Sequence, residues 1–123
     1  GSPGMNLLPV TMDGEAALTG SSRIPLTPAL AGKARAAAAA GAKLEIGIRP
    51  MYLGREDAGV DYGVAARINL VEEQGDCRIV TVSMGEVNVK ARVPEGRAIP
   101  SQEARAVFPP EWTRIFADGR LLK

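Results

Sequence analysis

The residue types that most often do chemistry in proteins are scarce in this sequence. Its 123 residues include no histidine and one cysteine, Cys77. Histidine is the commonest general base and the commonest metal ligand, so its absence removes both roles. A single cysteine excludes an internal disulfide and a cysteine-based zinc site, and it suits a reducing compartment. Because no histidine or second thiol accompanies it, we interpret Cys77 as a small packed residue of a strand. The sequence therefore predicts no catalytic, cofactor-binding or metal site.

The glycines do not form a phosphate-binding loop. Such a loop reads Gly-x-x-x-x-Gly-Lys-Ser/Thr and holds nucleotide phosphates and Mg²⁺. The one Gly-Lys pair, Gly32-Lys33, is followed by Ala34 and falls inside a predicted helix. We therefore expect no ATP binding of the P-loop kind, and no cofactor, in this fragment.

Four side chains are candidates for bridging parts of the domain or contacting a partner. Arg49 ends an apolar segment just before a proline, where its guanidinium can bind carboxylates or carbonyls in a bidentate way. Glu72 and Glu73 would point to opposite faces of a strand, so we expect no carboxylate pair, and a contact of Glu72 with backbone or arginine would fix a turn. Trp112 and Phe116 are expected to close one end of a barrel, with an exposed Trp112 at a dimer surface as the alternative.

The charge balance argues against a nucleic-acid or anionic-membrane surface. Lys and Arg number 15 and Asp and Glu number 14, which leaves a net charge of +1. The segments 64–71 and 77–93 contain no aromatic residue, although single-strand-binding barrels stack bases on aromatic rings. No apolar run approaches the ~18 residues of a membrane span.

The elements that must position these side chains are one helix and many short strands. Thr27 suits an N-cap, Pro28 a first helical position and Gly41 a left-handed end, so the alanine-rich segment predicts a helix over about 28–40. Alternating apolar residues between turn signals predict strands. These are 7–10, 15–18, 23–26, 44–48, 62–71, 77–83, 86–93, 104–108, 113–116 and 120–122.

Turn chemistry separates these strands. We expect segment 7–10 at a sheet edge because Pro9 cannot donate to a central ladder. A polar loop is predicted at 54–61 and a turn at 72–76, while Asp118-Gly119 predicts a type I′ hairpin. Short strands with frequent turns and one helix indicate an all-β protein, mainly antiparallel, built as a small barrel or sandwich.

Four segments, in consistent order along the chain, resemble one family. They are Gly-Ser-Pro-Gly-Met-Asn-Leu-Leu at 1–8, Ile-Gly-Ile-Arg-Pro at 46–50, Val-Glu-Glu-Gln-Gly at 71–75, and Pro-Glu, Phe and Asp-Gly within 108–119. Together they resemble the C-terminal regulatory (TOBE or OB-like) domain of the ATPase subunits of carbohydrate-type ABC importers. Met51 and Ala117 depart from the family, which favours acidic residues at both places.

The resemblance implies an OB-like β-barrel formed by a single domain over 1–123, with two β lobes at about 5–50 and 51–123 as a variant. Residues 1–6 would be a linker from an ATPase domain. The implied function is non-catalytic: regulation and dimerisation of the ATP-binding subunit of an importer for sugars, polyols or glycerol phosphate, at the cytoplasmic face of the membrane. ATP and Mg²⁺ would belong to the parent subunit.

The implied partners are the chain's own ATPase domain, a second copy of the subunit, the permease subunits and a regulatory protein, with no nucleic acid among them. Two alternatives stay open at this point. One is a module that senses a small molecule or oxyanion, and the other is a barrel that binds single-stranded nucleic acid.

Overall fold

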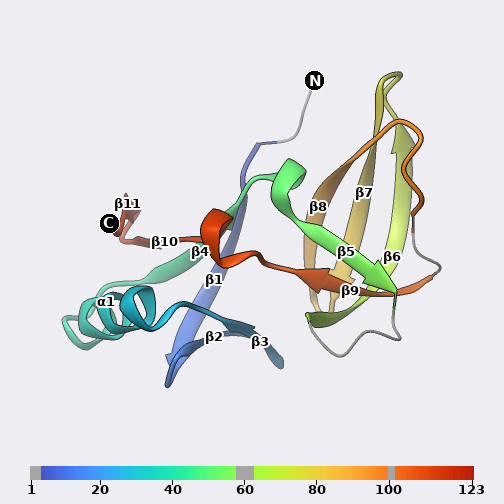
Figure 1. Ribbon diagram of the computed structural model, residues 1–123. Coiled ribbons are helices and arrows are strands. Elements are labelled where there is room, and N and C mark those ends of the chain that lie inside the picture. The colour runs from blue at the N-terminus through green and yellow to red at the C-terminus, as the bar shows by residue number, and fades with distance from the viewer. Residues whose placement is uncertain (1–3, 58–62, 100–101) are drawn as a thin grey trace.

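The computed structural model describes residues 4–57, 63–99 and 102–123, which form short strands, one α-helix and two 3-10 turns (Figure 1). In chain order these are β1 (Asn6–Asp13), β2 (Ala16–Thr19), β3 (Ser22–Pro25), α1 (Pro28–Ala39), β4 (Leu44–Ile48), η1 (Pro50–Tyr52), β5 (Gly54–Asp57), β6 (Val64–Glu73), β7 (Cys77–Met84), β8 (Val87–Pro94), β9 (Glu103–Val107), η2 (Pro110–Trp112), β10 (Arg114–Ala117) and β11 (Arg120–Leu121).

The strands form two curled sheets. The first has the order β11-β10-β4-β1-β2-β3 and the second the order β5-β9-β6-β7-β8. Every strand pair among the described residues is antiparallel. In Figure 1 the 3-10 turns η1 and η2 stand between the two sheets. This architecture is OB-like, which confirms the predicted mainly antiparallel all-β fold with a single helix. The division into lobes at about residue 50 stays a prediction; the C-terminal strands β10 and β11 extend the first sheet beside β4.

One aliphatic core joins the two sheets. Ile46 and Ile115 of the first sheet and Val80 and Val89 of the second are buried in the same cluster. Ala31 of α1 reaches this cluster too, because a small side chain lets the helix approach closely. Removal of these side chains from water is the main force that holds the sheets together.

Helix α1 begins and ends as its sequence predicts. The Thr27 hydroxyl accepts a hydrogen bond from the Leu30 N–H at 3.3 Å. Gly41 has φ +94°, the left-handed conformation that closes a helix. Ala34 of this helix is buried, whereas Ala38, one turn further on, is exposed.

Two predicted boundaries need correction. Strand β1 is not an edge strand, because residues 6–10 pair with β4 and residues 11–13 pair with β2. Pro9 is nevertheless accommodated, since its half of the strand has a neighbour on one side only. The loop predicted at 54–61 begins as strand β5, which pairs with β9, and residues 58–61 lie outside the described part of the chain.

Strand β6 corrects a third prediction. It continues through Glu73, so the turn predicted at 72–76 begins later. Its pairing with β7 shifts by one residue between Ile68 and Leu70, which is a β-bulge. Ile68 lies opposite buried Val82, but Leu70 lies opposite Thr81 and is 53% exposed. The inward-facing side of β6 therefore ends at Ile68, because a one-residue slip sends the next apolar side chain to the other face.

A single side chain joins the open edge of β8 to the start of β1. The Asn6 amide donates from Nδ2 to the Lys90 carbonyl and accepts at Oδ1 from the Lys90 N–H, both at 2.8 Å. Strand β8 pairs only with β7 on its other side. The Asn6 amide thus takes the place of a missing strand residue and bridges the two sheets.

Candidate functional site

Three of the four predicted contact residues meet at one hollow, which the first sheet and the turns η1 and η2 form. The hollow has a volume of about 410 Å³. Arg49, Trp112 and Phe116 all line it, and we call it the aromatic hollow. Its lining consists of Met5, Arg49, Tyr52, Trp112, Arg114, Phe116 and Leu121.

The two 3-10 turns η1 and η2 form one wall of the aromatic hollow. Each of η1 and η2 has a proline at its first positions and an aromatic residue at its last, Tyr52 and Trp112. The Tyr52 N–H donates to the Arg49 carbonyl at 2.9 Å, and the Trp112 N–H donates to the Pro109 carbonyl at 3.0 Å. The two rings stack with centroids 4.0 Å apart and planes 4° from parallel. This stack ties the turns together, and Trp112 still exposes 41% of its surface.

The floor of the aromatic hollow depends on Gly47 of β4. A Cβ at this position would lie 2.6 Å from Cε2 of Phe116 and 2.9 Å from Sδ of Met5. The missing side chain therefore gives the Phe116 ring and the Met5 thioether room to lie directly on the strand. This packing explains why Gly47 is buried although it faces away from the main core.

The charged groups of the aromatic hollow are both cationic. Arg114 donates from NH1 to the Glu111 carbonyl at 2.8 Å, which holds it along η2. Arg49 is exposed, and its guanidinium group has no hydrogen bond or ion pair within the described part of the chain. None of the described residues that line the hollow carries a carboxylate. Its two guanidinium groups can therefore bind carboxylates or oxyanions presented from outside.

Exposed apolar side chains continue outward from the aromatic hollow. Leu7, which pairs across β1 and β4 with Gly47, is 49% exposed. Leu121, which pairs with Phe116, is 42% exposed, and Met51 of η1 is 50% exposed. Large apolar residues gathered on one face and rimmed by charge are typical of an interaction surface.

The fourth candidate, Glu72, is not part of this surface. It is exposed on β6 in the other sheet, opposite Ile79. The residues that sequence reasoning missed are Met5, Tyr52, Arg114 and Leu121. A repeated signal was available for one of them, since Pro-Met-Tyr at 50–52 and Pro-Glu-Trp at 110–112 share the same spacing.

The lone cysteine is buried, and its sulfur is already engaged. Its Sγ accepts a hydrogen bond from Nε of Arg92 at 3.3 Å. This hydrogen bond to Cys77, with the Asp76 carboxylate 3.6 Å from the guanidinium, raises the pKa of Arg92 above its ordinary value. Among the described residues, no group of three histidine, cysteine or acidic side chains is placed to hold a metal ion.

Comparison with known proteins supports the same class of domain. Residues 1–50 match the family model of the MalK OB fold domain. This match covers β1 to β4 and α1, with Gly47 in β4 and Arg49 directly after it. It agrees with the resemblance to the regulatory OB domain of a sugar ABC importer's ATPase subunit, and it supports a regulatory domain of an ABC transporter.

A search of curated proteins finds no match to the chain. In the described residues, no helix is long and apolar enough to cross a membrane.

Proposed function

We propose that this chain is a non-catalytic regulatory and dimerisation domain of the ATP-binding subunit of an ABC importer. The observation that carries the proposal is the aromatic hollow, an exposed apolar surface with two arginines on an OB-like fold whose first 50 residues match the MalK OB fold domain. The importer would carry sugars, polyols or glycerol phosphate. The subunit would act at the cytoplasmic face of the membrane, where its ATPase domain meets the permease subunits and binds ATP and Mg²⁺.

In this proposal two copies pack their aromatic hollows against each other about a two-fold axis. Such an interface is self-complementary, so a residue of one copy meets a different residue of the other. Arg49 and Arg114 of one copy would face Glu45 and Glu111 of the other, since both acids lie beside the hollow on β4 and η2. Trp112 would be the anchor, because buried aromatic residues carry much of the free energy of binding at interfaces.

The contact between the two copies would have a mechanical role and would catalyse no reaction. It would hold two subunits together while their ATPase domains open and close. A regulatory protein that occupied the same surface in one state only would shift the equilibrium towards that state.

The proposed pairing can be tested by sedimentation equilibrium of the chain over a range of concentrations. The wild-type chain should self-associate, and Trp112→Ala should raise the dissociation constant by about tenfold or more. Leu70→Ala removes a similarly exposed apolar side chain, 53% against 41% for Trp112, from the other sheet and should leave the constant unchanged. A wild-type chain that stays monomeric at millimolar concentration, or equal weakening by both variants, would contradict the pairing.

A second function has specific support in the same residues. The stacked rings beside two arginines, with no carboxylate in the lining, could hold a small sugar, sugar phosphate or oxyanion. A thermal-shift screen with these compounds should then raise the melting temperature, and Arg49→Gln should remove the rise. Single-stranded nucleic acid has less support, because strands β5 to β9 contain no aromatic residue on which bases could stack.

A further inference from the structure

A second hollow lies between helix α1 and the first sheet, and it shares no lining residue with the aromatic hollow. We call it the helix hollow. Its volume of about 620 Å³ is in the range of sites for small organic ligands. It is lined by Pro9, Val10, Thr11 and Met12 of β1, Arg35 and Ala38 of α1, and Ala42, Lys43 and Leu44 at the entry to β4.

The helix hollow arises from unequal strand lengths. Strand β4 begins at Leu44, opposite Val10, so residues 11–13 of β1 have no strand partner on that side. The chain leaves α1 and turns at Gly41 before it enters β4, and Ala38 of α1 is too small to fill the space beside β1. The result is a recess with an apolar floor at the edge of the sheet.

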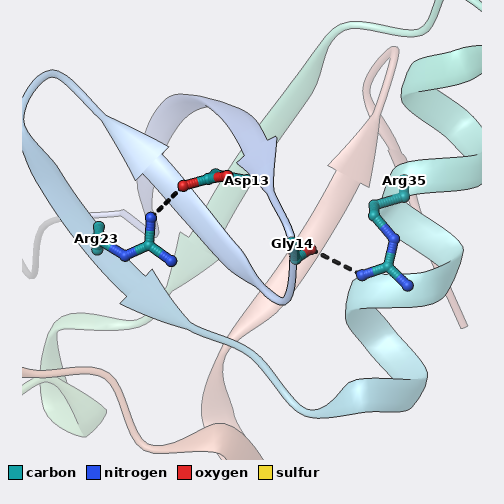
Figure 2. Close-up of polar contacts among 4 residues, drawn as sticks. All are labelled: Asp13, Gly14, Arg23 and Arg35. Atoms are coloured by element: carbon teal, nitrogen blue, oxygen red, sulfur yellow. Dashed lines mark hydrogen bonds and ion pairs between the residues drawn. The ribbon is translucent and has the colours of Figure 1, made fainter.

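Two cationic side chains, Arg35 and Lys43, line this recess. Arg35 reaches from α1 towards the turn between β1 and β2 and donates from NH1 to the Gly14 carbonyl at 2.7 Å (Figure 2). This bond fixes the guanidinium and uses one of its five N–H donors, which leaves the others available. Figure 2 also shows the Asp13 carboxylate directed to Arg23, with which it forms an ion pair, rather than to Arg35.

The second cation, Lys43, has a fixed backbone. Its N–H donates to Oδ1 of Asp118 at 2.9 Å, and its carbonyl accepts from the Asp118 N–H at 2.8 Å. Its ammonium group has no hydrogen bond or ion pair within the described residues. As in the aromatic hollow, none of the described residues that line the helix hollow carries a carboxylate.

We propose that the helix hollow binds a small amphiphilic anion, with a carboxylate or phosphate head between Arg35 and Lys43 and an apolar body over Met12, Ala38 and Ala42. Both head groups accept charge-assisted hydrogen bonds from guanidinium and ammonium groups. The apolar body would cover surface that the end of β4 leaves exposed to water. This site does not depend on the function proposed for the aromatic hollow, because the two share no residue.

Isothermal titration calorimetry of the whole chain with four probes tests the site. Octanoate and octyl phosphate carry the head and the apolar body, octanol carries only the body, and inorganic phosphate carries only a head. At concentrations that form no micelles, we expect saturable one-to-one binding of octanoate, octyl phosphate or both. Octanol and inorganic phosphate should bind at least tenfold more weakly. Which of the first two binds more tightly identifies the head group.

Variants separate this site from unspecific binding. Lys43→Gln should weaken binding by about tenfold, the typical effect of losing one charge-assisted hydrogen bond. Ala38→Leu fills the recess from an exposed helix position while keeping both charges, and it should abolish binding. Lys33→Gln on the same helix, whose Nζ contacts the carbonyl of Lys123, and Trp112→Ala should both bind as the wild type does.

Three results would overturn the proposal. The first is that neither octanoate nor octyl phosphate binds. The second is that octanol binds as tightly as octanoate. The third is that Ala38→Leu binds as well as Lys33→Gln, because the ligand would then lie elsewhere. A circular dichroism spectrum of each variant shows that loss of binding is not loss of fold.

Discussion

Replacing Gly47 with alanine should destabilise the domain, whereas the same replacement at Gly32 should stabilise it. The added methyl group would lie 2.6 Å from Cε2 of Phe116 and 2.9 Å from Sδ of Met5, so both side chains must move. Overpacking of this kind costs about 1–3 kcal/mol. Restricting the unfolded backbone returns about 0.4–1 kcal/mol, so the free energy of unfolding should fall by about 1–2 kcal/mol.

The matched control is Gly32→Ala. This residue lies within α1, and a Cβ there would meet nothing within 4 Å. Alanine is better than glycine inside a helix by about 0.8–1 kcal/mol, so this variant should be more stable than the wild type. Two identical chemical changes should thus have opposite effects.

Thermal and urea unfolding followed by far-ultraviolet circular dichroism measure both variants. A difference of 1 kcal/mol corresponds to about 4 °C in melting temperature for a chain of this length. The double variant Gly47→Ala with Phe116→Leu removes the ring that the methyl group meets. Its loss of stability should therefore be smaller than the sum of the two single losses. Strict additivity, or a Gly47→Ala variant as stable as the wild type, would refute the packing described for the floor of the aromatic hollow.

Two further changes test the arrangement of the sheets, both by urea unfolding. Asn6→Ala removes two hydrogen bonds to Lys90 and should lower the free energy of unfolding by about 1–2 kcal/mol. The control Asn69→Ala loses one exposed hydrogen bond to a hydroxyl and should lower it by less. Equal losses would mean that the Asn6 bridge adds no stability beyond that of an exposed hydrogen bond. Leu70→Ser should change the free energy of unfolding by no more than about 0.5 kcal/mol, because the bulge turns this side chain outward. Ile68 packs against the core, so Ile68→Ser should lower it by about 1–2 kcal/mol. The reverse order would place the bulge elsewhere.

Features that depend on residues close together in the sequence were predictable, and features that depend on distant residues were not. The helix cap at Thr27 and the hairpin at Asp118-Gly119 were predictable, because each depends on residues within a few positions. The structure bears this out, with φ of +50° at Asp118 and +82° at Gly119, as a type I′ turn requires. The bulge in β6 was not predictable, because it depends on how β7 pairs beside it.

For the candidate site, too, the residue types were predictable from the sequence but their arrangement in space was not. The residue types of Arg49, Trp112 and Phe116 marked them as contact residues, but no local pattern places them together. They meet because β10 returns from the end of the chain to pair with β4, in a register that sets Arg114 opposite Gly47.

The amino-acid sequence by itself determined the class of this protein. The alternation of short apolar segments and the turn signals between them indicate an antiparallel all-β domain, since local periodicity acts without tertiary contacts. The tertiary structure alone decided where the surfaces lie. Both hollows form where strands of unequal length or distant origin meet, and such pairings depend on packing across the whole chain rather than on any one segment.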